Sequence, residues 1–167
     1  YTKSAEQGNQ YAQSGLAHLY ETGRGVKKDL KQAVEWYTKA AEQGLVYSQL
    51  RLGSMCSLGQ GLEKDESKAA EWFLKAANQN SGVGQYTVGI IYLEGKGVER
   101  DRKKGENWLR QARVTFLKDM ENKKGEDAGA AGKLSHIYYR GLGIKKDSVE
   151  AYKWALIARQ APQQTPA

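Results

Sequence analysis

The chain has 167 residues, a formal net charge of +7, 40% hydrophobic residues and one cysteine. A single cysteine excludes an internal disulfide, and no apolar run approaches the roughly 18 residues that cross a membrane as a helix. The positive charge can steer acidic partners toward the surface.

Helix-period patterns alternate with glycine-rich loops along the chain. Residues 1–8 match 37–44 at every position except Ser4, so they are predicted to end a helix whose first half lies upstream, in further repeats or behind a signal peptide. The remaining helices are expected at 9–21, 30–43, 45–57, 66–79, 81–93, from about 102, 127–139 and 148–160. The stretch 161–167 is polar with two prolines, and we expect a flexible tail there.

One motif, Gly-x-Gly-apolar-x-basic-Asp, occurs four times. Its first glycines are Gly23, Gly59, Gly95 and Gly141, at spacings of 36, 36 and 46 residues. A nearly fixed period of this length is typical of a solenoid, and four units exceed the three that usually bury a continuous core. The glycines permit a tight reversal after one helix, and the aspartates (Asp29, Asp65, Asp101, Asp147) are predicted N-caps of the next.

The residues around this motif keep the same phase in every unit. A tryptophan follows each first glycine by 13 residues, and a tyrosine, or Cys56 in the second unit, precedes it by three. Small residues stand at 10 and 17 residues after it. These offsets predict two helices per unit, which we call helix A and helix B, in close contact with tryptophan and tyrosine filling the core. Cys56 is expected to fill the core as the tyrosines do.

The combined pattern resembles the Sel1-like repeat, a relative of the tetratricopeptide repeat. Ala-x3-Leu-Gly/Ala-x2-Tyr, then Gly-x-Gly-Val-x-Lys-Asp, then Ala-x2-Trp-Tyr-x-Lys-Ala-Ala-Glu-Gln-Gly stands nearly complete from Ala12 to Gly44. The resemblance implies an all-α, right-handed α-α superhelical solenoid. It predicts a single domain, 1–160, with four repeats at 9–44, 45–80, 81–126 and 127–160. It also suggests a bacterial protein, with the periplasm favoured over the cytoplasm.

The third unit departs from the pattern by ten additional residues. Ala112, Phe116 and Met120 keep a spacing of four, so helix B is predicted to continue until Lys123 and Lys124, with Gly125 beyond its end. The sequence leaves open whether this extension over 113–124 has a function or is a larger cap over the last unit.

No catalytic or metal-binding constellation is recognisable. The two histidines, His18 and His136, fall in the first and last units, and no His/Cys/Asp/Glu cluster has metal-ligand spacing. The Gly-x-Gly loops follow helices, whereas a dinucleotide-binding loop follows a strand. We therefore expect no enzyme, no cofactor and no metal.

Helix A has a face that the repeat pattern does not use. The resemblance implies that helix A lines the concave side, and this face is polar in the first unit but apolar or aromatic in later ones. We predict a groove that binds a partner protein through Leu50, Tyr86, Ile90, Leu93, His136 and Tyr139. The alternative is that some of these residues pack between neighbouring A helices. Gln13, Gln49 and Gln85 recur in phase and are expected to bond the inter-repeat backbone rather than a ligand peptide.

The leading hypothesis is thus a monomeric, non-enzymatic interaction module. The resemblance suggests an immunity protein that blocks a secreted effector, or an adaptor in the cell envelope. The alternative is a binder of acidic polymers, namely nucleic acid, glycan or lipid headgroups. It would act through the third repeat, where ten basic and five acidic residues lie between Lys96 and Lys124. Nucleic acid is the less expected ligand because no aromatics interleave with these basic residues.

Overall fold

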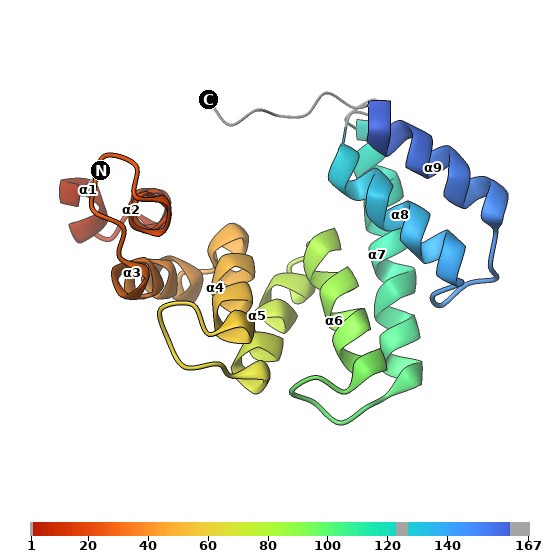
Figure 1. Ribbon diagram of the computed structural model, residues 1–167, viewed down its shortest axis with the longest axis horizontal. Helices are drawn as coiled ribbons and strands as arrows, with labels where there is room; N and C mark the ends of the chain where they lie inside the picture. Colours follow the sequence, from red (N-terminus) through yellow and green to blue (C-terminus); the bar gives the residue numbers. More distant parts are fainter. Residues whose placement is uncertain (1, 123–126, 161–167) are drawn as a thin grey trace. The chain divides into compact units, whose positions relative to one another are not determined.

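The computed structural model describes residues 2–122 and 127–160, and within these ranges the regular structure is entirely helical. The helices are α1 (Thr2–Glu6), α2 (Gln10–Thr22), α3 (Leu30–Glu42), α4 (Val46–Leu58), α5 (Glu66–Asn78), α6 (Gly82–Glu94), α7 (Arg102–Asn122), α8 (Ala128–Arg140) and α9 (Ser148–Gln160) (Figure 1). The predicted order of helices is confirmed, and most of the predicted helix bounds differ from the observed ones by one residue.

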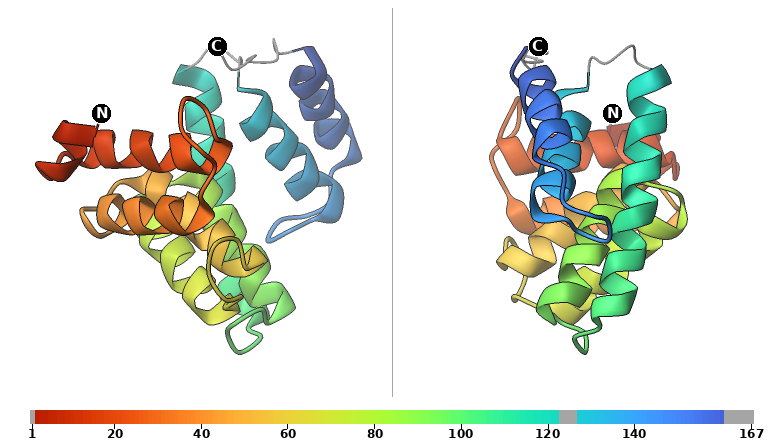
Figure 2. Two further views of the ribbon diagram at one scale, coloured as in Figure 1. Left: turned by 60° about the vertical axis from the view of Figure 1, so that its left-hand side comes forward. Right: turned by 90° about the vertical axis from the view of Figure 1, so that its right-hand side faces the viewer.

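The chain divides into two compact units. Unit 1 contains residues 1–79 and 95–99, and unit 2 contains 80–94 and 100–167. Within unit 1 the pairs α2 with α3 and α4 with α5 pack side by side, and within unit 2 the pairs α6 with α7 and α8 with α9 do so (Figures 1 and 2). In the described ranges, no helix is both long and apolar enough to cross a membrane.

Each helix B begins at the aspartate that the motif places there. The side chain of Asp29 accepts hydrogen bonds from the backbone N–H groups of Lys31 and Gln32. Asp65, Asp101 and Asp147 cap their own helices in the same way. These bonds satisfy amides that a helix start leaves without partners, so the predicted caps are confirmed.

The second glycine of the motif has a role beyond its positive φ. A Cβ at Gly61 would overlap the carbonyl oxygen of Leu30, and one at Gly97 would overlap that of Glu66. The loop that leaves one helix A therefore lies directly on the first turn of the preceding helix B. Sequence analysis predicted a turn at these glycines but missed this inter-repeat contact.

The core is built on small residues and on the residues that follow Trp36, Trp72 and Trp108. Tyr37 and Leu109 have no exposed side-chain surface, and Phe73 is 8% exposed. The tryptophans are only half-buried; Lys39 and Lys75 lie over the rings of Trp36 and Trp72 at 4.1 and 3.8 Å from their centroids. Tryptophan therefore fills the core only in part: the indoles lie at its edge, where Trp36 and Trp154 pack against buried clusters. Cys56 is buried as predicted, and burial raises the pKa of its thiol.

The third helix B continues beyond the usual repeat, as predicted. α7 is 21 residues long, whereas α3, α5 and α9 each have 13. Its added turns bury Phe116 and Met120 in one cluster with Ala130 and Ala131 of α8. This side of the extension thus helps to form the core of unit 2. The predicted helix end at Lys123–Gly125 and the predicted tail at 161–167 lie outside the described residues.

Candidate functional site

The predicted binding residues fall into both units. Leu50 is half-buried on α4 of unit 1, whereas the other five lie on α6 and α8 of unit 2. These two A helices of unit 2 contact each other directly. We call the surface formed by Tyr86, Ile90, Leu93, His136 and Tyr139 the α6/α8 face.

A hydrogen bond between α6 and α8 joins the centre of this face. The Tyr86 hydroxyl lies 2.7 Å from Nδ1 of His136, and the two rings meet edge-on with centroids 6.0 Å apart. Burial raises the pKa of Tyr86, an effect that Arg140 opposes and Glu94 reinforces. Burial, together with the nearby Arg140, lowers the pKa of His136. Both shifts favour the uncharged forms, a protonated phenol and a neutral imidazole, and the direction of their hydrogen bond depends on the imidazole tautomer.

The apolar members of the face have a structural role as well. Tyr86, Ile90 and Leu93 are half-buried and pack against the core of unit 2, and the ring centroids of Tyr86 and Phe116 are 6.4 Å apart. The alternative interpretation, that these residues pack between helices, is therefore correct for the buried part of each side chain. The part that remains exposed is available to a ligand.

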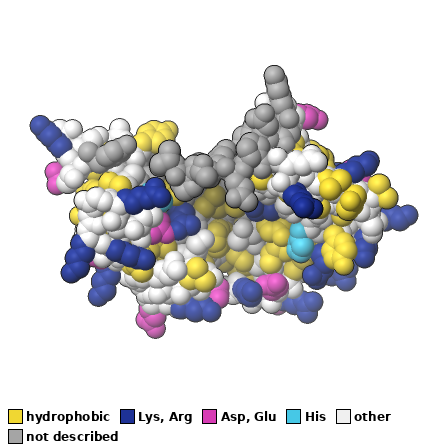
Figure 3. Space-filling model, turned by 45° about the horizontal axis from the view of Figure 1, so that its top comes forward, with side chains coloured by type: hydrophobic (Ala, Val, Ile, Leu, Met, Phe, Trp, Pro, Cys, Tyr) yellow, Lys and Arg dark blue, Asp and Glu magenta, His cyan; other side chains and the backbone are white. Residues whose placement is uncertain are grey.

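Tyr139 differs from these residues because its side chain is largely free. It is 57% exposed, and the Lys146 ammonium lies 4.8 Å from its ring centroid. It follows His136 by three residues on α8, so both side chains lie on neighbouring parts of the helix surface. On the surface drawn in Figure 3, exposed hydrophobic side chains lie among lysine and arginine side chains.

The corresponding surface in unit 1 is a polar cluster around Glu21. Glu21 accepts a hydrogen bond of 2.8 Å from the Tyr37 hydroxyl and forms an ion pair with Arg51. Nδ1 of His18 lies 3.8 Å from the same carboxylate, and the rings of Tyr37 and Tyr47 are 6.3 Å apart. Burial, followed by the bond to Glu21, raises the pKa of Tyr37. This cluster links α2, α3 and α4, so it stabilises unit 1.

Sequence analysis did not connect these unit 1 residues. It noted only that the helix A face of the first unit is polar, and it did not consider Tyr37 and Arg51 as partners of Glu21. The signal available was the spacing of 30 residues between Glu21 and Arg51, which places them on successive A helices.

Two of the three in-phase glutamines form hydrogen bonds with the backbone of the preceding repeat, as expected. Gln13 Nε2 donates to the carbonyl of Ala5, and Gln49 Nε2 donates to that of Ala41, both at 3.1 Å. Gln85 is buried, and its Oε1 accepts a hydrogen bond from Thr115 at 2.8 Å. These glutamines are therefore structural.

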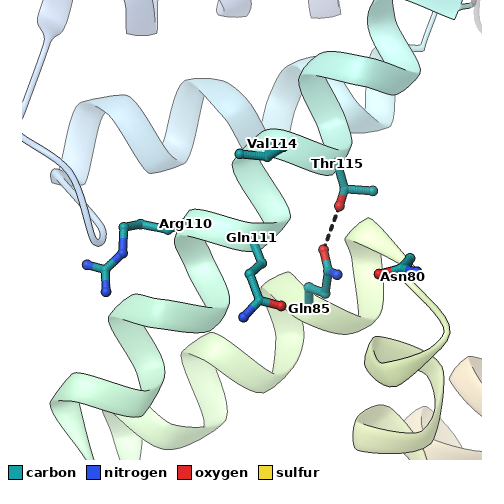
Figure 4. A pocket seen from close by; sticks show the side chains of 6 residues that line it. All are labelled: Asn80, Gln85, Arg110, Gln111, Val114 and Thr115. Atoms are coloured by element: carbon teal, nitrogen blue, oxygen red, sulfur yellow. Dashed lines mark hydrogen bonds between the residues drawn. The ribbon is translucent and has the colours of Figure 1, made fainter.

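Gln85 also lines a depression on unit 2 that sequence analysis missed. Its volume is about 340 Å³, and Figure 4 shows the lining side chains on α6, on α7 and in the loop before α6. They are Asn80, Gln85, Arg110, Gln111, Val114 and Thr115. The depression is wide open, and no titratable pair or metal-ligating cluster occupies it. Within the described ranges, no group of three or more His, Cys, Asp or Glu residues could hold a metal ion.

A family model for the Sel1 repeat matches four segments of the chain, residues 10–45, 46–81, 82–113 and 128–161. The chain belongs to the Sel1 repeat family. The matched segments follow the observed helix pairs, and the gap in the matches contains the extension of α7. The fold is therefore the expected all-α Sel1 solenoid, which also accounts for its tetratricopeptide-like helix pairs.

Solved structures of bacterial Sel1 proteins are similar to this chain. A Sel1 repeat protein from Oxalobacter formigenes is 31% identical, with a TM-score of 0.69, over 93% of this chain and 59% of its own length. A protective antigen with an SLR fold from uropathogenic Escherichia coli is 28% identical, with a TM-score of 0.65, over 95% and 40%. The chain thus spans less than two thirds of either relative. No curated protein matches it.

Sel1 repeats generally mediate protein–protein interactions, and proteins built from them are typically non-catalytic scaffolds. In this Sel1 chain the repeat residues hold the helices together through caps, small residues and glutamines. The α6/α8 face of unit 2 uses different positions, and Tyr139 on it is exposed without a contact that stacking requires.

Proposed function

We propose that this Sel1 protein is a non-enzymatic interaction module that binds a partner protein through the α6/α8 face. The observation that carries the proposal is the 57% exposure of Tyr139, three residues beyond the bonded His136. Tyrosine loses little side-chain entropy on binding, combines a large apolar surface with a polar tip, and is enriched among residues that dominate binding energy. The half-buried Tyr86, Ile90 and Leu93 of α6 add apolar surface to the same face.

The specific role that fits best is an immunity protein that blocks a secreted effector, with an envelope adaptor as the alternative. Both roles suit a bacterial, periplasmic Sel1 protein. An immunity protein predicts one tight complex with a single effector, whereas an adaptor predicts several partners of moderate affinity. Leu50 of unit 1 is a further proposed contact, since it lies at the corresponding position on α4.

Affinity capture from the native lysate tests the proposal with a matched pair of variants. Tyr139→Glu changes the α6/α8 face, and Tyr152→Glu changes a tyrosine of α9 that is 65% exposed. We expect one protein to be retained at high salt by the parent and by Tyr152→Glu, and to fall by about tenfold or more with Tyr139→Glu. Equal retention by both variants would contradict the assignment of the face.

A second candidate function rests on the distribution of charge. The described residues of unit 2 include thirteen lysines and arginines but eight aspartates and glutamates, whereas unit 1 has eleven and ten. Such a surface fits an acidic polymer, with glycans and lipid headgroups ahead of nucleic acid. This function predicts binding that falls steeply with salt and that Tyr139→Glu and Tyr152→Glu weaken alike, since each adds one negative charge to unit 2.

A further inference from the structure

The hydrogen bond between Tyr86 and His136 is compatible with either tautomer of the imidazole. The Tyr86 hydroxyl lies 2.7 Å from Nδ1, and burial and Arg140 lower the pKa of His136, which favours the neutral ring with its single N–H. In the tautomer in which the hydroxyl donates to Nδ1, that N–H lies on Nε2. Among the described residues, no hydrogen bond to Nε2 is formed. In this tautomer the α6/α8 face presents one oriented donor among apolar side chains.

Positive charge lies beside this donor. Arg140 is exposed, follows His136 by four residues on α8, and is close enough to act on both Tyr86 and His136. Lys146 approaches Tyr139 from the loop after α8. Glu94 of α6 offsets part of this charge, but unit 2 as a whole is positive in its described residues. The face thus combines N–H donors, cations and apolar rings.

We propose that the α6/α8 face recognises a peptide segment in which a carboxylate side chain is flanked by aromatic or apolar residues. The carboxylate accepts from Nε2 of His136 and pairs with Arg140, while its neighbours pack on Tyr139 and the exposed edges of Ile90 and Leu93. A carboxylate is favoured over a backbone carbonyl because hydrogen bonds from a cation to an anion are the stronger kind. The inference rests on the proposed function and specifies the chemistry of the partner.

Tyr86 acts in this scheme as a positioning residue. Its hydroxyl fixes the tautomer and the ring orientation of His136, so that the Nε2–H direction is set before a ligand arrives. Tyr86→Phe keeps the ring and its packing but removes the hydroxyl. Long-range ¹H–¹⁵N correlation spectra are expected to show an unprotonated Nδ1 in the parent and a mixture of tautomers in Tyr86→Phe. A parent that carries its proton on Nδ1 would overturn the inference.

Fluorescence anisotropy with the full 167-residue chain tests recognition of the ligand. The probe is a labelled random copolymer of glutamate and tyrosine, compared with polyglutamate and with heparin in the same physiological salt. The parent is expected to bind the copolymer about tenfold more tightly than either comparison polymer, because only the copolymer offers rings beside its carboxylates. Equal binding of all three polymers would overturn the inference in favour of unselective charge attraction.

Two arginine variants provide the matched comparison. Arg140→Gln is expected to weaken copolymer binding by about tenfold, as loss of a charge-assisted hydrogen bond does. Arg159→Gln removes an equally exposed charge from the end of α9 and is expected to leave binding within about twofold. Equal losses in both variants, or no copolymer binding by the parent, would overturn the inference. If lysate capture still depends on Tyr139 in that case, the proposed function stands and only this inference is lost. If lysate capture does not depend on Tyr139 either, both the inference and the proposed function are lost.

Discussion

At the scale of single residues, two polar clusters join neighbouring helices. In unit 1, Glu21 pairs with Tyr37 and Arg51, and partly buried polar groups of this kind stabilise only when they are paired. In unit 2, Tyr86 pairs with His136, and both side chains are half-buried. The pKa of His136 is lowered, so this second pair is the one from which we derive a dependence on pH.

The lowered pKa of His136 predicts a dependence of stability on pH. A histidine ordinarily titrates near 6.5, and here burial and then Arg140 depress the folded value. Between the two values the unfolded chain binds more protons, so stability is highest above pH 6.5 and declines as pH falls toward the folded pKa. Thermal unfolding of the parent at pH 7.5 and at pH 5 is expected to show this decline.

His136→Gln is the comparison that isolates this effect, because the variant has no titrating ring. Its melting temperature is expected to fall less between the same two pH values. Arg140→Gln removes the charge that opposes protonation, so it should also reduce the decline. An unchanged pH dependence in His136→Gln would show that other groups are responsible.

At the scale of elements, α7 shows how an insertion became part of the core. Phe116 is 2% exposed and contacts the N-terminal part of α6, where a Cβ on Gly82 would clash with its ring. Met120 is 4% exposed and belongs to the cluster that includes the first half of α8. Removing these side chains would leave a cavity where α6, α7 and α8 meet.

Phe116→Ala is therefore expected to lower the free energy of unfolding by about 3–5 kcal/mol, as phenylalanine truncation in a core does. Val114→Ala on the same helix is the control; its side chain is 58% exposed, so a change within about 0.5 kcal/mol is expected. Urea unfolding followed by circular dichroism measures both. A loss below about 1 kcal/mol for Phe116→Ala would mean that the extension does not support unit 2.

The elements could be predicted from the sequence because each rule that defines them is local. The aspartate caps, the helix period and the spacing of four through Met120 each depend on residues within a turn or two. The contact of Gly61 with Leu30 and the ion pair of Glu21 with Arg51 could not be predicted in this way, since they join residues about 30 positions apart. The position of the tryptophans at the edge of the core was not predicted, because a repeated large side chain resembles a core residue in sequence.

The candidate face was only partly predictable for the same reason. The positions that the repeat does not use could be found from phase alone, and they include Tyr86, His136 and Tyr139. Their hydrogen bond and the nearby Arg140 depend on how α6 and α8 approach each other. Leu50 lies in the other unit, so it remains a separate prediction.

At the scale of the whole molecule, stability and recognition use different parts of each repeat. The loops, caps and glutamines recur in phase and hold successive helices together. The residues of the α6/α8 face differ from those at the corresponding positions of the other units. Positive charge is concentrated in unit 2, which also contains that face. The central claim is that the face, rather than the charged surface alone, binds the partner.

Hydrogen–deuterium exchange of the complex with the captured partner tests this claim most directly. The account predicts slower exchange on binding in peptides that cover 86–93 and 136–140. It predicts little change at the start of α7, which contains Arg102 and Lys103, and in the loop that contains Lys145. Protection limited to those basic segments, with α6 and α8 unchanged, would contradict it and favour the acidic-polymer function.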